Sequence, residues 1–263
     1  MDEIMRPIAL VTGGSAGIGL EIAKLLAADG HDLIVTGISP RVHDAAEALR
    51  ACGGKVTAVQ SDLSRPEGVQ QVVEAVQAAG RLDVMVLNAG IAVGGAFLDN
   101  ALERHLNLID LNIGSTVRLC HALVPDLIRT QGKILMVSSV SAMAPTPYES
   151  VYGPSKAFMS SFGHGLREEL RGTGVNVTIL HPGATATEFH HRAGMDATVF
   201  GDNSWKNDPV LVARQGVEAM MAGVTSLIGG DEATQRIGEE RKDLSEEEKA
   251  RRHAEKARPP KTR

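Results

Sequence analysis

The sequence predicts an α/β fold in which helices cover both faces of a doubly wound parallel sheet of about seven strands. Three observations support this fold class. Short β-rich runs alternate with segments of helical apolar spacing along most of the chain. The runs are almost continuously apolar, as residues 84–87 (VMVL) show, which strands buried on both faces require. A glycine-rich stretch, residues 13–19, joins the first run to the first helical segment. Right-handed crossovers would wind such alternating elements into a Rossmann-type sheet.

The individual elements follow from the same patterns. Strands are expected at residues 8–11, 33–36, 56–59, 84–87, 134–137 and 175–180, with a weaker one at 225–228. Helices are expected at residues 18–28, 42–51, 66–79, 102–128, 152–171 and 208–222. Within the long fourth helix, Asn112 interrupts the apolar face and Gly114 predicts a local distortion.

Composition favours one domain, residues 1–230, followed by a charged helical extension and tail, residues 231–263. From residue 238 onward the chain is nearly free of large apolar residues, which predicts a surface helix and a frayed end. The sequence leaves open whether this extension covers the core, joins a subunit boundary or stays mobile.

Charge and cysteine content limit the classes of binding partner and the cellular compartment that are expected for this protein. The net charge of −5 and the absence of a basic, aromatic-studded stretch argue against nucleic acid. The first residues lack a signal-peptide pattern and no apolar run would span a bilayer, so a cytoplasmic protein without membrane contact is expected. Cys52 and Cys120 lack C-x-x-C or zinc spacing, which indicates packed thiols. No metal site is expected, because the adjacent His190 and His191 would face opposite ways.

The glycine-rich stretch predicts a dinucleotide site. Glycines let backbone amides approach a pyrophosphate, and the following helix N-terminus adds donors and a favourable dipole. The residues concerned are Gly13, Ser15, Gly17, Ile18 and Gly19. Their spacing is G-x-x-x-G-x-G rather than G-x-G-x-x-G.

That spacing, T-G-x-x-x-G-I-G, resembles the signature of the short-chain dehydrogenases/reductases. Further matches follow in the family's order: Asp62-Leu63, Asn88-Ala89-Gly90, Tyr152-x-x-x-Lys156, Pro182-Gly183 and Thr187. The resemblance implies that Asp62 and Leu63 flank the adenine and that Asn88 steadies the sheet and the adenosine side. It also implies that Thr187 holds the nicotinamide carboxamide, with Pro182, Gly183 and Thr185 beside it. Taken alone, Asn88-Ala89-Gly90 could equally be a strand-ending turn.

The end of the second strand bears on the choice of cofactor. An acid there would bind the ribose 2'-hydroxyl and exclude a 2'-phosphate, but the chain reads VTGISPR from residue 35. Ser39 could donate to a phosphate and Arg41 could pair with it. Against this, Ala16 stands where many NADPH-preferring relatives carry a basic residue, and Arg41 could be a solvated residue at a helix start. NADP(H) is therefore favoured, with NAD(H) as the alternative.

Tyr152 is the expected proton-transfer residue. Reduction of a carbonyl leaves an alkoxide that needs a proton, and a lysine four residues along a helix would lower the pKa of a tyrosine. Tyr152 and Lys156 supply this pair. The resemblance adds that Lys156 holds the nicotinamide ribose, that Ser139 orients the substrate oxygen, with Ser138 as a structural neighbour, and that Asn112 holds a water linking Lys156 to solvent.

A long connection, residues 184–207, is expected to form a substrate lid. Phe189 and Met195 in this lid, with Val93, Met143 and Pro145 elsewhere, are candidate pocket walls, although the lid's apolar residues could equally pack onto the core. They favour a hydrophobic carbonyl or alcohol as substrate.

The expected function is therefore an NAD(P)(H)-dependent oxidoreductase acting on a carbonyl or secondary alcohol. A nicotinamide-binding regulator without chemistry is the alternative, but it would need none of the proton relay. A sugar-nucleotide epimerase is disfavoured, because little chain remains for a separate substrate domain. The resemblance also implies a homodimer or homotetramer, built on the helices expected at 102–128 and 152–171.

Overall fold

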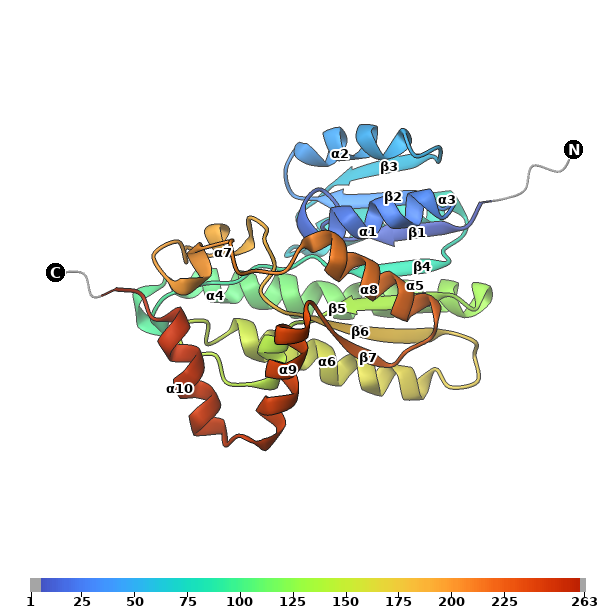
Figure 1. Ribbon diagram of the computed structural model, residues 1–263. Helices are drawn as coiled ribbons and strands as arrows, with labels where there is room; N and C mark the ends of the chain where they lie inside the picture. The colour runs from blue at the N-terminus through green and yellow to red at the C-terminus, as the bar shows by residue number, and fades with distance from the viewer. Residues whose placement is uncertain (1–5, 261–263) are drawn as a thin grey trace, which may run out of the picture.

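The computed structural model describes residues 6–260, and within them seven parallel strands form one sheet (Figure 1). The strand order is β3-β2-β1-β4-β5-β6-β7, which confirms the doubly wound fold class. The strands are β1 (Ile8–Val11), β2 (Asp32–Gly37), β3 (Val56–Gln60), β4 (Val84–Leu87), β5 (Lys133–Val137), β6 (Asn176–Pro182) and β7 (Ser226–Gly229). All seven lie within a few residues of their expected positions.

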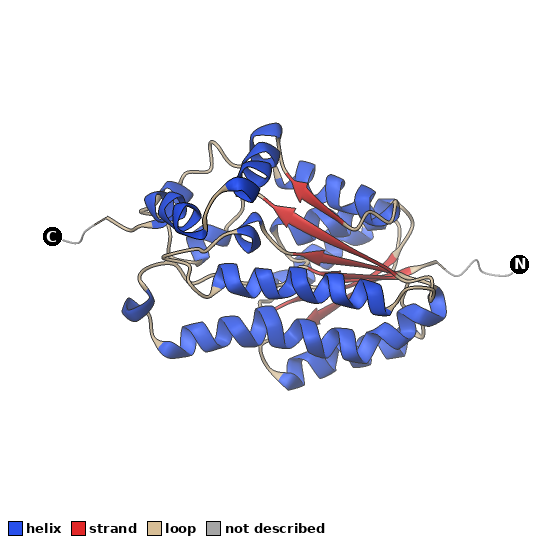
Figure 2. Ribbon diagram, turned by 90° about the horizontal axis from the view of Figure 1, so that it is seen from below, coloured by secondary structure: helices blue, strands red, loops and turns tan. Residues whose placement is uncertain are grey.

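Helices cover both faces of the sheet (Figure 2). One layer holds α1 (Gly17–Ala28), α2 (Arg41–Arg50) and α8 (Pro209–Met221). The other holds α3 (Pro66–Ala79), α5 (Thr116–Thr130) and α6 (Tyr152–Glu169). Neighbouring strand residues alternate between the layers: Val11 and Val35 pack in the first core, and Leu10 and Ile34 in the second. Both faces are therefore buried, which explains the uninterrupted apolar strands.

The helix expected at residues 102–128 is distorted near its middle. It consists of α4 (Leu102–Ile109), a π-helical segment (Asp110–Ser115) and α5. The wider turn contains both Asn112 and Gly114, so the distortion expected from Gly114 is present. It leaves Asn112 fully buried at the level of the strand ends.

The lid and the C-terminal segment gather on the side to which the strand arrows point (Figure 1). The lid contains the short helix α7 (Phe189–Arg192), and the extension forms α9 (Glu232–Glu240) and α10 (Glu246–Ala257). Most of α10 is exposed or partly exposed, but His253 and Ala257 are buried. The expected surface helix thus has an inner face that packs onto the molecule. Within residues 6–260, no helix has both the length and the apolar character needed to cross a bilayer.

Candidate active site

A cavity of about 1100 Å³ lies at the carboxyl ends of the strands. Its walls come from the glycine-rich loop, the segments after β2, β3, β4, β5 and β6, the lid, and the helices α9 and α10. Its volume slightly exceeds the roughly 300–1,000 Å³ typical of a site for one small ligand. The cavity is therefore large enough to hold a dinucleotide and a substrate together.

The glycine-rich loop can accept a pyrophosphate. Gly13 has a φ of 64°, and a Cβ atom there would lie 2.9 Å from Asn88 Nδ2. Gly17 has a φ of 56°, and a Cβ atom there would lie 3.1 Å from Thr187 Cγ2, in the cavity. No described side chain caps the start of α1, so its first amides remain available to an anion. A side chain at either of these two glycines would strain the backbone and fill the space in which the loop can accept a pyrophosphate.

Asn88 connects two neighbouring strand ends. Its Nδ2 donates to the carbonyl oxygens of Thr12 (2.9 Å) and Gly13 (3.2 Å). Thr12 Oγ1 in turn accepts from the backbone amides of Asn88 and Ala89. Sequence reasoning did not identify Thr12, although its place before Gly13 was a signal. These bonds hold the glycine-rich loop rigidly against the end of β4.

Most of the expected cofactor residues share the cavity wall. These are Gly13, Ser15, Gly17, Ile18, Arg41, Asp62, Leu63, Asn88, Ala89, Gly90, Tyr152, Lys156, Pro182, Gly183, Thr185 and Thr187. Two do not line it. Gly19 lies under the loop, where a Cβ atom would overlap Gly13 O and Asn88 Nδ2, and Ser39 lies outside the cavity wall.

Arg41 reaches the cavity already paired. Its Nη1 donates to Glu188 Oε2 at 2.9 Å, and Arg192 also pairs with Glu188. The carboxylate raises the pKa of Arg41, and the two guanidinium groups lower that of Glu188. Both side chains of the Arg41–Glu188 pair are about half exposed. Such a pair is weak and exchangeable, so Arg41 could turn to a phosphate at little cost.

Tyr152, Lys156 and Ser139 converge in one corner of the cavity. Tyr152 and Lys156 lie one turn apart on α6, with Lys156 Nζ 5.9 Å from the centre of the tyrosine ring. Lys156 Nζ donates to Val137 O at 2.9 Å, and Ser138 Oγ donates to Lys156 O at 2.9 Å. Ser139 opens the segment after β5 and hydrogen-bonds the tyrosine hydroxyl. Three groups suited to proton transfer thus share one buried corner.

Burial dominates the electrostatics of this corner. It raises the pKa of Tyr152, and the nearby Glu149 charge adds to this rise, while the hydrogen bond with Ser139 opposes it. Burial also lowers the pKa of Lys156 to about 8. The net effect in the described chain is a raised pKa of Tyr152, opposite in direction to the lowering expected from Lys156. A protonated phenol is the form suited to donating a proton to an alkoxide.

Asn112 lies behind this corner rather than on the cavity wall. Its Oδ1 accepts from Ile91 N at 3.0 Å, and its Nδ2 donates to Ile91 O and to Ser155 Oγ. A Cβ atom on Gly90 would lie 3.2 Å from Asn112 Oδ1 and 3.3 Å from Lys156 Nζ. Asn112 and Lys156 therefore flank the same glycine, and the π-helical segment is what brings Asn112 there.

The expected pocket walls divide into two groups. Val93 and Phe189 line the cavity, and the Phe189 ring lies 5.3 Å from that of Tyr152. Met143, Pro145 and Met195 do not line it. Met195 instead lies in the core beneath the lid, where it fills the space left by Gly94. Apolar lid residues therefore serve both of the expected roles: Phe189 lines the cavity, and Met195 packs onto the core.

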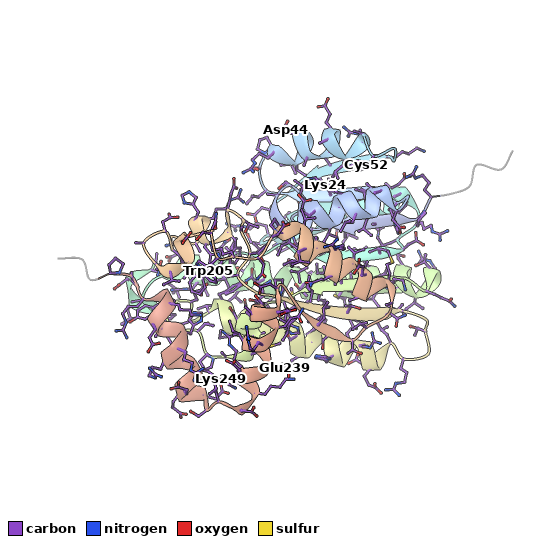
Figure 3. All side chains as sticks on the ribbon, in the orientation of Figure 1. Lys24, Asp44, Cys52, Trp205, Glu239 and Lys249 are labelled. Carbon is purple, nitrogen blue, oxygen red and sulfur yellow. The ribbon has the colours of Figure 1, made fainter. Side chains whose placement is uncertain are left out.

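Further cavity residues come from the predicted lid, from the segment just before α6 and from α10, and sequence reasoning missed those outside the lid. Glu149, His190, Phe200 and His253 all line the cavity. Figure 3 labels Trp205 on the lid and Lys249 on α10, two further wall residues from the same end of the molecule. The only signals were an acid three residues before Tyr152 and the i, i+4 spacing of His253 and Ala257 in a charged helix. Among residues 6–260, no group of three or more His, Cys, Asp or Glu side chains could hold a metal ion.

Comparison with known proteins agrees with this geometry. The model of the family described as short chain dehydrogenase matches residues 7–197. An uncharacterized oxidoreductase of Methylorubrum extorquens is 33% identical over 242 residues, which cover 91% of this chain and 96% of that protein. A short-chain dehydrogenase from Sphingobium yanoikuyae in complex with NADPH superposes with a TM-score of 0.79 at 32% identity, covering 84% of this chain and 87% of that one. A 3-oxoacyl-[acyl-carrier protein] reductase from Brucella melitensis in complex with NAD superposes with a TM-score of 0.72 at 30% identity, covering 85% and 95%.

Proposed function

Because the chain belongs to the short-chain dehydrogenase/reductase family, we propose that it interconverts a carbonyl compound and a secondary alcohol, with Tyr152 as the proton-transfer residue. The observation that carries this proposal is the shared buried corner of Tyr152, Lys156 and Ser139. A protein that only bound a dinucleotide would not need a tyrosine hydroxyl hydrogen-bonded to a serine beside a buried lysine.

The roles of the chain's own groups follow from their positions. When bound, a nicotinamide supplies or accepts the hydride. Ser139 Oγ orients the substrate oxygen next to the phenol, and Tyr152 Oη donates a proton to that oxygen during reduction. Lys156 holds a positive charge behind Tyr152 and is placed to contact the ribose. Asn112 fixes the segment after β4 against α6, and a water on it would return the proton to Tyr152 through Lys156. Alcohol oxidation reverses these steps.

The proposed cofactor is NADP(H), with NAD(H) as the alternative. β2 ends at Gly37, and the residues that follow, as far as Arg41, include no acid of the kind that would bind the ribose 2'-hydroxyl and exclude a 2'-phosphate. Arg41 lines the cavity just beyond and can exchange Glu188 for a phosphate. Among the relatives, the Sphingobium protein holds NADPH and the Brucella protein holds NAD, so the preference rests on these side chains.

The proposed substrate is a small, largely hydrophobic carbonyl compound or alcohol. Val93 and Phe189 form apolar walls of the cavity, and Phe200 and Trp205 add aromatic surface from the lid.

The chain is also proposed to act as a homodimer or homotetramer. Exposed apolar side chains follow α4 and α5, namely Leu102, Leu106, Ile109, Val117 and Ile128. A face of this kind is typical of a subunit contact, and the mass in solution tests it.

NADPH oxidation with a panel of aldehydes and ketones tests the activity. We expect turnover by the wild type and a loss of about 10²–10⁴-fold in kcat/KM for Tyr152→Phe, since the general acid is removed. The NADPH dissociation constant should stay within about threefold of the wild-type value in this variant. Tight NADPH binding by the wild type with no carbonyl reduced would refute the enzymatic proposal in favour of a regulator.

A further inference from the structure

Two buried polar atoms on the substrate side of the cavity have no hydrogen-bond partner among the described residues. They are Glu149 Oε1 and His190 Nδ1. Glu149 is 2% exposed and His190 is 9% exposed, and both residues line the cavity. Burying a polar atom without a partner is costly, so native proteins usually provide one. Neither atom is used by the proton-transfer groups described above.

The other carboxylate oxygen of Glu149 is held by α10. His253 Nε2 lies 3.1 Å from Glu149 Oε2, and both side chains are buried. Tyr148, the residue before Glu149, has a left-handed φ of 67°, a conformation that is unfavourable for a tyrosine and typical of functional sites. Glu149 is thus fixed on one side, while its second oxygen is buried without a hydrogen-bond partner among the described residues.

Glu149 and His190 belong to one continuous wall around the substrate position. The ring of His190 stacks on Phe200 at 5.0 Å, and Phe200 lies 5.9 Å from the ring of His253. In the other direction, His190 contacts Phe189, which contacts Tyr152. The Glu149 carboxylate is also close enough to the Tyr152 phenol to raise its pKa. A substrate that reaches Tyr152 therefore lies within this wall.

The two free atoms complement each other chemically. Glu149 Oε1 accepts a hydrogen bond. Burial lowers the pKa of His190 to about 4, so its imidazole is neutral and Nδ1 can donate or accept, depending on the tautomer. A hydroxyl group both donates and accepts. A substrate hydroxyl can therefore give its proton to Glu149 Oε1 or accept a hydrogen bond from His190 Nδ1.

We propose that Glu149 and His190 form a specificity site that binds a hydroxyl group of the substrate, in addition to the carbonyl held at Tyr152 and Ser139. The preferred substrates are then hydroxylated ketones or aldehydes, and the corresponding diols in the oxidative direction. This inference rests on the proposed function.

Other groups fit the site less well. An apolar group would leave the carboxylate oxygen without a partner in a buried position. An ammonium group could pair with Glu149, but it has no lone pair with which to accept from His190 Nδ1. A carboxylate on the substrate would be repelled by Glu149. A neutral hydroxyl avoids these penalties and can pair with either free atom.

Matched ketones test the proposal. Cyclohexanone is compared with its 2-, 3- and 4-hydroxy derivatives, and acetophenone with 2-hydroxyacetophenone, by NADPH oxidation. Because a hydrogen bond to a charged group contributes about 1.5–3 kcal/mol, we expect at least one hydroxylated ketone to exceed its parent about 10- to 100-fold in kcat/KM. Binding of the same compounds to the enzyme–NADP⁺ complex, measured by calorimetry, should show the same order.

Isosteric variants identify the residues responsible. Glu149→Gln removes the charge while preserving the shape. The ratio of kcat/KM for the hydroxylated ketone to kcat/KM for its parent should then fall to within about threefold of one. His190→Phe keeps an aromatic ring beside Phe200 but removes Nδ1, and should reduce the preference several-fold. His191→Phe is the matched control, because His191 is exposed and pairs with Asp196. A preference that survives both Glu149→Gln and His190→Phe would overturn the proposal.

The outcomes separate this inference from the function on which it rests. If the wild type reduces none of the carbonyls in the broader panel, the oxidoreductase proposal fails. If it reduces parent and hydroxylated ketones equally well, only the hydroxyl site fails. Each variant is accepted for this test only if its melting temperature still rises with NADPH, which shows that the fold and the cofactor end are intact.

Discussion

The two ends of the cavity are built in different ways. At the cofactor end, the contacts come from short loops directly after strands, and many of them join a side chain to main-chain atoms of a neighbouring loop, as the hydrogen bonds among Thr12, Gly13 and Asn88 do. At the substrate end, side chains from three distant segments meet: Glu149, the lid and His253. The cofactor end therefore depends on backbone geometry and the substrate end on side-chain contacts over long sequence distances. Substitutions should affect one end without the other.

The largest effect is expected at Gly19. A Cβ atom there would overlap Gly13 O and Asn88 Nδ2, so Gly19→Ala should push the glycine-rich loop off the end of β4. We expect a loss of about 1–3 kcal/mol in the free energy of unfolding and NADPH binding weakened at least about 10-fold. Urea unfolding and NADPH titration measure these. Gly165→Ala on α6 is the control, since no atom lies near its Cβ position, and it should be neutral or stabilising.

His253→Ala should have its effect at the substrate end. It leaves the buried Glu149 carboxylate without its partner, so the free energy of unfolding should fall by about 1–3 kcal/mol. NADPH affinity should stay within about threefold of wild type. The exposed His43 on α2 offers a control, His43→Ala, expected to change stability by less than about 0.5 kcal/mol. A large loss of NADPH affinity in His253→Ala would mean that the two ends are not independent.

Lys156 should impose a pH dependence on the cofactor end. Burial lowers its pKa to about 8, so the ammonium is lost above that pH, and kcat/KM for NADPH should fall up to about tenfold per pH unit. Stability changes in the opposite direction. Since the folded chain releases this proton at lower pH than the unfolded chain, the contribution of Lys156 to stability rises with pH between about 8 and the usual lysine pKa of 10.5. Both effects should vanish in Lys156→Met, and an unchanged pH profile there would contradict this assignment.

The smallest effects are expected at Arg41. Arg41→Ala should weaken NADPH binding about 10-fold and leave NADH binding nearly unchanged, because Arg41 is proposed to contact only the 2'-phosphate, which NADH lacks. Glu188→Gln should do the reverse, improving NADPH binding by no more than about fivefold, since it releases Arg41 from an exposed pair. Competition of both dinucleotides measures this. Equal losses for NADPH and NADH in Arg41→Ala would favour NAD(H) as the cofactor.

Much of the fold could be predicted because its signals are local. Each strand is a short apolar run, and its alternation with helices predicts a parallel, doubly wound sheet because crossovers are almost always right-handed. The bounds of the elements differ by only a few residues, as for β6, expected at 175–180 and observed at Asn176–Pro182. The break in the long helix was also visible, because Gly114 and Asn112 are poor residues for a buried helical face.

The substrate end could not be predicted in the same way. Glu149 and His253 are 104 residues apart, and no spacing rule connects them. Met195 and Phe189 stand in the same lid and have similar apolar character, yet only Phe189 lines the cavity. Arg41 was predicted to be able to pair with a phosphate, and the sequence did not indicate that Glu188 in the lid pairs with it. In each case the decisive contact is between side chains that only the folded chain brings together.

The position of His253 on α10 bears on how substrate preference can change among relatives of this protein. The family model ends at residue 197, so α10 lies outside the matched segment, yet it contributes several residues to the cavity wall, and its His253 contacts both Glu149 and Phe200. Selection can therefore rewrite this helix without disturbing the proton relay or the glycine-rich loop. Exchanging α9 and α10 between relatives would test whether substrate preference can be changed while the proton-transfer residues and the glycine-rich loop stay the same.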